Sequence, residues 1–301
     1  MGLPAQSIKF IIKIKKKHCL KGPVLTLGNQ DIYATERDIT DWLEAEKVSF
    51  KKPSIIRKST SQEIVKINPQ AKNYIHAKTF FEFLDIPESQ YYDIDKFDLD
   101  KPKIFHDLER PLPSRYHNFF NFILDSGTLE HIFDIKSVME NIVKAVKIGG
   151  FVLHLTPAQN FLNHGFYQFC PTFFYDFYTS NGFKIVESYI IETRGKTYRF
   201  HYYNQKKDYV GLFLNSRNRL GNCFLVKKTK NLKKIVSPTQ YYYRILSENP
   251  SQVKKDFNGA SFDKFVSVMR KIIPIKYHGV FFIIWMRLKR LLSADKHFDI
   301  S

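Results

Sequence analysis

A strand–helix–strand pattern in the middle of the chain constrains its fold more than any other feature. Residues 122–124 form an apolar run of the length of a short buried strand, and Asp125 follows it. Over residues 135–147 apolar side chains recur at helical spacing, and a Gly-Gly pair is predicted to end that helix. A second apolar run occupies residues 151–155, and Pro157 is predicted to end it. The sequence therefore predicts two parallel strands joined by a helix, the unit of an open α/β sheet.

Similar patterns recur on both sides of this unit. Five further strands are predicted at residues 24–27, 90–93, 103–107, 183–191 and 222–226. Helices are predicted at residues 7–18, 31–43, 71–84 and 173–178, with a loop-rich insertion at 47–70 and a hairpin-like insertion at 193–218. Together with the two strands of the central unit, the five further strands give seven predicted strands. We therefore predict an α/β fold, with a Rossmann-like, mostly parallel, seven-stranded sheet and helices on both faces.

A glycine and several carboxylate residues follow the predicted strands, at the edge where open α/β sheets bind ligands. Gly28 comes directly after the strand at residues 24–27, and a glycine there lets the backbone approach a cofactor. Asp93 ends the next strand, where a carboxylate offers two acceptors to the two hydroxyl groups of a ribose. Asp95 is the alternative in another register, and either acid could instead be a solvated turn residue. We therefore predict a ligand site at this edge.

Three short motifs of the central unit form a recognisable pattern. They are Asp125, Leu129-Glu130-His131 and Gly149-Gly150. This pattern resembles the middle of class I S-adenosylmethionine-dependent methyltransferases, in which an acid follows the fourth strand and a Gly-Gly turn precedes the fifth. Residues 164–186 are similar to a little-characterised bacterial subgroup of that superfamily. The resemblance implies S-adenosylmethionine as the cofactor and methyl transfer to a small-molecule or glycan-type acceptor.

The resemblance also implies roles for residues at the strand ends. Gln30 stands where the family usually has a second glycine, and Thr26 stands where it has an acid. Asp107 and Leu108 stand where an acid accepts a hydrogen bond from the adenine amine and an apolar neighbour covers the ring. A plain turn is the alternative for this pair. The predicted cofactor site consists of Gly28, Gln30, Asp93, Asp107, Leu108 and Asp125.

Two histidines are predicted to lie on the acceptor side of this site. His131 follows the fourth strand, and His164 lies in the loop after the fifth, which rises from the same edge. Histidine titrates near neutral pH, so either residue could take a proton from a hydroxyl acceptor. A hydrogen-bonded structural role is the alternative for each. The three cysteines, Cys19, Cys170 and Cys223, lack metal-binding spacing, so we expect no metal site and a reducing compartment.

Nearly all of the net charge of +18 lies at the two ends of the chain. Residues 1–22 hold six basic and no acidic side chains, and residues 227–301 hold sixteen basic and five acidic ones. Residues 23–226, the predicted methyltransferase-like domain, are nearly neutral. The N-terminal segment is predicted to form a basic amphipathic helix, which either packs on the domain or contacts an anionic membrane. The C-terminal extension is predicted to be partly helical and has an apolar cluster at residues 280–286. It too could either pack on the domain or contact an anionic membrane.

The sequence also limits where the protein acts and what it binds. No apolar run reaches the roughly 18 residues of a spanning helix and no secretory signal is evident, so we expect a cytoplasmic protein, at most peripheral at the membrane. No RNA-binding motif is present, so no specific nucleic-acid partner is expected. Two alternative functions stay open: the single glycine of the first loop suits an inactive binding module, and the basic ends suit an RNA methyltransferase.

Overall fold

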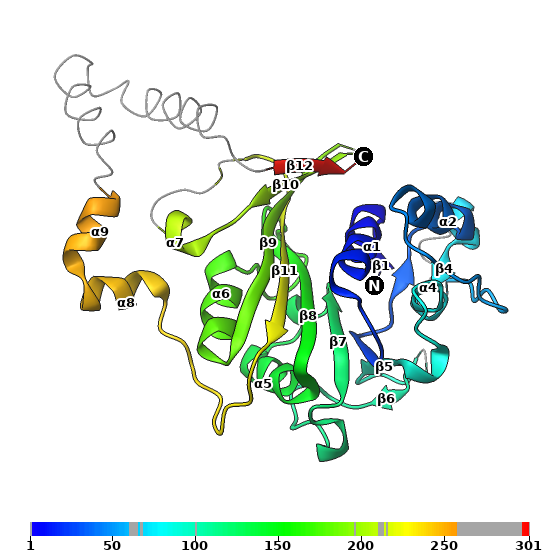
Figure 1. Cartoon of the computed structure of the whole chain (residues 1–301), viewed down its shortest axis with the longest axis horizontal. Coiled ribbons are helices and arrows are strands. Elements are labelled where there is room, and N and C mark those ends of the chain that lie inside the picture. Colours follow the sequence, from blue (N-terminus) through cyan, green and yellow to red (C-terminus); the bar gives the residue numbers. More distant parts are fainter. Residues whose placement is uncertain are drawn as a thin grey trace, which may run out of the picture.

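One large sheet runs through the part of the chain that the computed structural model describes, which is residues 2–59, 66, 69–99, 101–195, 197–209, 214, 216–257 and 297–300. Its strands are β2 (Val24–Leu27), β5 (Tyr91–Asp95), β6 (Ile104–Phe105), β7 (Phe120–Ser126), β8 (Val146–Gln159), β9 (Phe183–Arg194), β10 (Thr197–Tyr202), β11 (Leu220–Lys228) and β12 (His297–Ile300). They are ordered β12-β10-β9-β11-β8-β7-β2-β5-β6 (Figure 1). A second sheet, ordered β1-β3-β4, consists of β1 (Gly2–Leu3), β3 (Asp31–Ile32) and β4 (Ile75–His76).

The large sheet is mixed but mostly parallel in its central part, as predicted. Strands β6, β5, β2, β7 and β8 are parallel neighbours, whereas β11 lies antiparallel between β8 and β9. The prediction of seven strands is wrong, because β10 and β12 extend the described sheet to nine. The hairpin-like insertion supplies β10: Gly195 has a positive φ of 60° and lets the chain reverse between Arg194 and Thr197.

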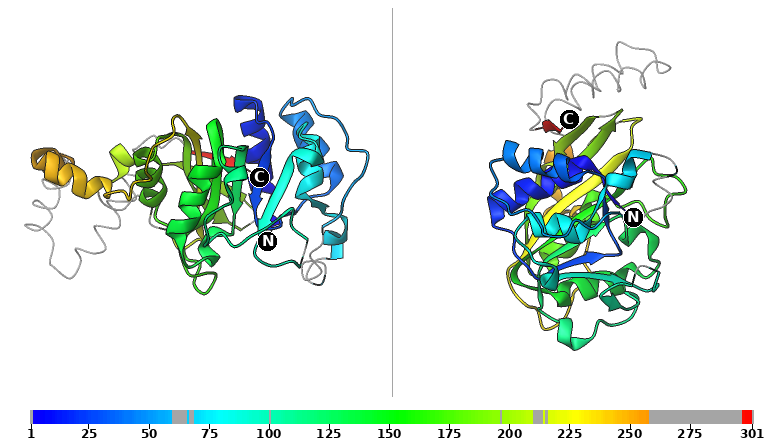
Figure 2. Two further views of the ribbon diagram at one scale, coloured as in Figure 1. Left: turned by 90° about the horizontal axis from the view of Figure 1, so that it is seen from below. Right: turned by 90° about the vertical axis from the view of Figure 1, so that its right-hand side faces the viewer.

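Helices cover both faces of the sheet, which confirms that part of the prediction (Figures 1 and 2). On one face lie α1 (Ala5–His18), α2 (Glu36–Ala45) and α4 (Ala77–Phe83), and on the other lie α5 (Ile135–Ala145) and α6 (Pro171–Ser180). Successive strand residues alternate between the two cores: Phe122 and Leu124 pack with the first set of helices, and Ile123 packs with the second. The central strands β2 and β7 are therefore buried on both sides, as their apolar sequences require.

The basic N-terminal helix packs on the domain. In α1 the side chains of Ile8, Ile11 and Ile12 are fully buried, and Phe10 stacks on Phe200 of β10. Its lysines lie at the rim, where Lys17 pairs with Glu187 of β9. The apolar face of α1 is thus used inside the protein, and the structure does not support membrane contact through it.

Several predicted boundaries are wrong for identifiable reasons. The helix predicted at residues 31–43 begins later, because Thr35 and Asp38 form a capping box in front of α2. The residues before it instead form β3, which pairs with β1 and β4. The helix predicted at residues 71–84 is shortened to α4, because the chain before it forms a 3-10 turn, η1 (Pro69–Asn73), and then β4.

The Gly-Gly pair does not end a helix. Helix α5 ends at Ala145, and β8 begins at once, so Gly149 and Gly150 lie inside the strand. Gly149 has a φ of +83°, and a Cβ on Gly150 would lie 3.0 Å from the Asn121 carbonyl oxygen. The pair therefore accommodates a register shift between β7 and β8.

Pro157 does not end its strand either. Strand β8 runs on to Gln159, pairing there with β11, whose register shifts between Leu220 and Gly221. Strand β7 has already ended, at Ser126, so β8 has one neighbour fewer at this point. A proline at such an irregular edge position costs few hydrogen bonds.

The described C-terminal part contains short helices. They are α7 (Gln205–Asp208), α8 (Tyr241–Glu248) and α9 (Pro250–Phe257). The apolar cluster predicted at residues 280–286 lies outside the described residues. Among the described helices, none has both the length and the apolar character needed to cross a membrane.

Candidate functional site

The carboxyl ends of β2, β5, β6 and β7 meet at one edge of the sheet. Leu27 is in register with Ile94 of β5 and with Asp125 of β7, and the Gly28 amide donates to the Ile94 carbonyl at 2.9 Å. Asp107 follows β6 at the same edge. The chain proceeds outward from β2 through β5 to β6 and then returns to β7 on the other side of β2. Open α/β sheets bind ligands at such a reversal.

Gln30 lies at this reversal and bridges its two sides. Its side chain is fully buried, and its Nε2 donates to the carbonyl oxygens of Leu27 (3.0 Å) and Ser126 (3.3 Å). Its Oε1 is buried and has no hydrogen-bond partner among the described residues. A buried acceptor without a donor is costly, so an ordered water or a ligand group is needed to supply one.

Asp125 is fully buried and bonded to the protein itself. Its Oδ1 accepts from the amides of Thr128 and Leu129, and its Oδ2 accepts from His154 Nδ1 at 2.7 Å. The hydroxyl of Tyr178 in turn donates to His154 Nε2 at 2.6 Å. All three side chains are inaccessible, and burial raises the pKa of Tyr178. Asp125 therefore fixes the turn after β7.

His154 and Tyr178 were not predicted from the sequence. His154 lies in the apolar run of β8, in register with Asp125 on β7. A histidine within a buried strand, beside an acid at the end of its parallel neighbour, is the signal that could have found this contact.

The two candidate ribose-binding acids occupy different places in β5. Asp93 lies two residues before the end of the strand, is 1% exposed, and accepts from the Lys103 amide at 2.8 Å. Asp95 is the last residue of the strand and lies beside Gly28 at the edge, since Ile94 pairs with Leu27. Its Oδ1 accepts from the Phe97 amide at 3.0 Å. The register therefore brings Asp95, rather than Asp93, to the site.

The Asp107–Leu108 turn is clamped by helix α5. Asn141 Nδ2 donates to the carbonyl oxygens of Leu108 (2.9 Å) and Arg110 (2.7 Å), and its Oδ1 accepts from the Leu112 amide (2.9 Å). Asp107 itself accepts from the Glu109 amide at 3.0 Å. Asn141 is 2% exposed and was not predicted, although an asparagine on the apolar side of a helix pattern is a usable signal.

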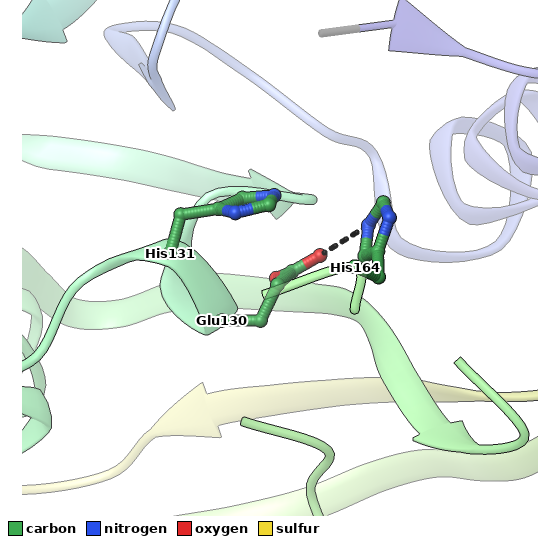
Figure 3. Close-up of side chains that lie close together, drawn as sticks. All are labelled: Glu130, His131 and His164. Carbon is green, nitrogen blue, oxygen red and sulfur yellow. Dashed lines mark ion pairs between the residues drawn. The ribbon is translucent and has the colours of Figure 1, made fainter. Parts of the chain in front are cut away.

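Two histidines and a glutamate lie together beside the reversal (Figure 3). Glu130 and His131 belong to a 3-10 turn, η4 (Leu129–His131), and His164 comes from the loop after β8. His164 Nε2 is 3.4 Å from Glu130 Oε1, and the two imidazole rings are 5.1 Å apart. Burial, and then the charge of Asp125, raises the pKa of Glu130 to about 8. Burial, and then His164, lowers the pKa of His131.

The comparisons with known proteins yield structural similarity alone. No protein-family model matches the chain, and no curated protein matches it significantly. Among solved structures, the chain resembles the citrinin polyketide synthase CMeT domain with a TM-score of 0.36 and 12% identity. That match covers 76% of this chain and 52% of the other, so the chain spans about half of that structure's length.

Two further structures show the same degree of likeness. A Burkholderia thailandensis 1,6-didemethyltoxoflavin-N1-methyltransferase, solved with S-adenosylhomocysteine, gives a TM-score of 0.37 at 10% identity, over 75% of this chain and 78% of the other. A SAM-dependent methyltransferase from Thermotoga maritima gives 0.33 at 13% identity, over 75% and 89%. Likenesses of this size carry no argument about activity. Most of the solved structures found by this comparison are S-adenosylmethionine-dependent methyltransferases, at low sequence identity, and another is a branched-chain polyamine synthase from Thermus thermophilus.

Proposed function

We propose that this protein binds S-adenosylmethionine at the shared edge of β2, β5, β6 and β7 and transfers its methyl group to a small-molecule or glycan-type acceptor. The observation that carries the proposal is the buried, unpartnered Oε1 of Gln30 at the reversal of strand order. An ammonium group, such as that of the amino-acid part of the cofactor, would give this oxygen its missing donor.

The residues around Gln30 suit the rest of the cofactor. Gly28 has a positive φ of 73° and no side chain, so the backbone can lie close to the ligand. Asp95 offers a carboxylate to the ribose hydroxyl groups. Asp107 and Leu108 offer an acceptor and an apolar surface to the adenine, on a turn that Asn141 holds in place. We propose these residues as the cofactor site, with Asp93 and Asp125 supporting it from within the protein.

The acceptor side is proposed to be formed by His131 and His164. Both lie on loops that rise from the same edge, and the His164 side chain is 48% exposed, so an acceptor can reach it. The cofactor supplies an electrophilic methyl group when bound. The protein has only to hold the acceptor in line with it, exclude water and, for a hydroxyl acceptor, receive a proton.

Calorimetry with S-adenosylmethionine tests the cofactor site. We expect binding by the wild-type chain and about tenfold weaker binding by Asp95→Ala, since a lost hydrogen bond to a ligand costs about 1 kcal/mol or more. Asp41→Ala, which removes an acid on the outer side of α2, is the matched control and should bind as the wild type does. A folded wild-type protein that fails to bind the cofactor at millimolar concentration would contradict the proposal.

The inactive binding module is the second candidate, because the Gln30 side chain fills part of the first loop. The enzyme predicts turnover, and the module predicts none. Incubation with methyl-labelled S-adenosylmethionine and fractionated small-molecule and glycan extracts separates them. Label transferred to any fraction supports the enzyme, and binding without transfer to either fraction favours the module.

A further inference from the structure

Glu130, His131 and His164 form a group whose composition matches a metal site. One candidate ligand atom from each residue lies within 4.8 Å of the others (Figure 3). Two imidazole nitrogens and one carboxylate oxygen are a ligand set that Zn²⁺ and other divalent first-row ions accept. Ligand atoms around a tetrahedral Zn²⁺ are about 3.4 Å apart, given bonds of about 2.1 Å. The 3.4 Å between His164 and Glu130 already matches this spacing, and His131 has to move closer.

The glutamate of this group is buried without enough hydrogen-bond donors or positive charges to replace its lost hydration. Glu130 is 1% exposed, and its Oε2 is buried with no hydrogen-bond partner among the described residues. Its ion-pair partner in the described structure is His164, a residue of the outer loop. A carboxylate in this position is unfavourable unless a cation or a donor reaches it. This burial is an observation independent of the clustering, and a bound cation would compensate it.

The backbone holds the two halves of the group together. The amides of Phe166 and Tyr167 both donate to the Glu130 carbonyl oxygen, at 2.8 and 3.3 Å. A Cβ on Gly165 would lie 2.7 Å from the same oxygen, so a glycine is required for this close approach. His164 is thereby held beside Glu130 although 33 residues of chain separate them. The site is consequently built by the fold and does not depend on chance contact between surface side chains.

We propose that Glu130, His131 and His164 bind one divalent transition-metal ion of the Zn²⁺ type. Three protein ligands leave a fourth position open, and the exposed side of His164 directs it toward solvent or an acceptor. With the ion bound, both imidazoles would serve as ligands and would no longer be free to take a proton from an acceptor. This inference does not rest on the proposed methyl transfer.

Titration of the full-length, chelator-treated protein with Co²⁺ and Zn²⁺ tests the site. We expect one Co²⁺ per chain, with visible absorption typical of a four-coordinate ion, and its displacement by Zn²⁺. Glu130→Gln and His164→Ala should each weaken Co²⁺ binding by about a hundredfold or more, because loss of outer contacts alone costs about ten- to a hundredfold. His117→Ala, at an exposed histidine bonded to the Leu112 carbonyl, is the control and should bind as the wild type does.

Thermal unfolding with and without Zn²⁺ is a second measurement, needed in case one of the variants folds poorly. Zn²⁺ should raise the midpoint of thermal unfolding of the wild type, since a ligand of the folded state stabilises it by mass action. His164→Ala changes a half-exposed loop residue, so it should fold and lose this shift. Absence of one-to-one Co²⁺ binding, or binding that survives both Glu130→Gln and His164→Ala, would overturn the proposal. S-adenosylmethionine binding should also be measured on the chelator-treated protein, so that the metal proposal and the cofactor proposal can fail independently of each other.

Discussion

At the scale of single residues, the buried polar side chains at the edge shared by β2, β5, β6 and β7 differ in whether their hydrogen bonds are satisfied. Buried polar atoms without a described hydrogen-bond partner also occur away from this edge, in Gln6, His18 and Asn222. Most buried side chains at this edge are satisfied within the protein, as Asp125 and His154 are. Gln30 and Glu130 each keep one buried oxygen without a described partner. Since such atoms are unfavourable in a folded protein, their occurrence at the same edge supports ligands there. The Gln30 oxygen supports the cofactor proposal, and the Glu130 oxygen supports the metal proposal.

Glu192, at the end of β9, shows the opposite case, a carboxylate with many donors. Burial opposes its ionisation, but donors from Ser216, Asn218, His201 and Arg194 outweigh burial and hold the pKa at about 2. Since its pKa in the unfolded chain is about 4.5, the stabilisation is full above that pH and is lost as the pH falls toward 2. We expect the difference in unfolding free energy between wild type and Glu192→Gln to shrink over this range in urea titrations. A difference independent of pH would contradict this assignment.

At the scale of elements, helix α5 connects the core to the proposed cofactor site. Its apolar side, including Val138 and Ile142, packs on the sheet, and Asn141 on the same side reaches the turn after β6. The turn that presents Asp107 is therefore held by a helix that forms no part of the site.

Replacing Asn141 should affect stability and cofactor affinity together. Asn141→Ala removes three hydrogen bonds and is expected to lower the unfolding free energy by about 3 kcal/mol, at about 1 kcal/mol each. Cofactor affinity should also fall, because the turn loses its support. Glu140→Ala, which removes the surface pair with Lys144, is the control and should cost about 0.5 kcal/mol. Denaturant titration and calorimetry measure both effects, and equal losses in the two variants would refute the role of the clamp.

At the scale of the whole molecule, the basic N-terminus is part of the domain's core. The α1 side chains Ile8, Phe10, Ile11, Ile12 and Ile14 are at most 3% exposed. Each such side chain contributes about 1.5–3 kcal/mol to the free energy of unfolding when it is buried. The sum over these five side chains is as large as the usual net stability of a domain, about 5–15 kcal/mol.

Deletion of residues 1–18 should therefore prevent folding. We expect the truncated chain to lack a cooperative thermal transition by circular dichroism, whereas Lys9→Ala together with Lys13→Ala, at the partly exposed rim of α1, should retain it. A truncated chain that unfolds with the wild-type midpoint would show that α1 adds nothing to the core.

The sequence by itself determined the parallel central unit, the helices on both faces and the edge at which Gly28, Asp107 and Asp125 meet. These follow from local apolar periodicity, because each strand and helix must bury its own side chains. Only the tertiary structure decided that Asp95 ends β5, that Asn141 supports the Asp107 turn, and that Glu130 lies beside His164. Those contacts join residues distant in the chain, and strand register and loop packing, which no local pattern records, bring them together.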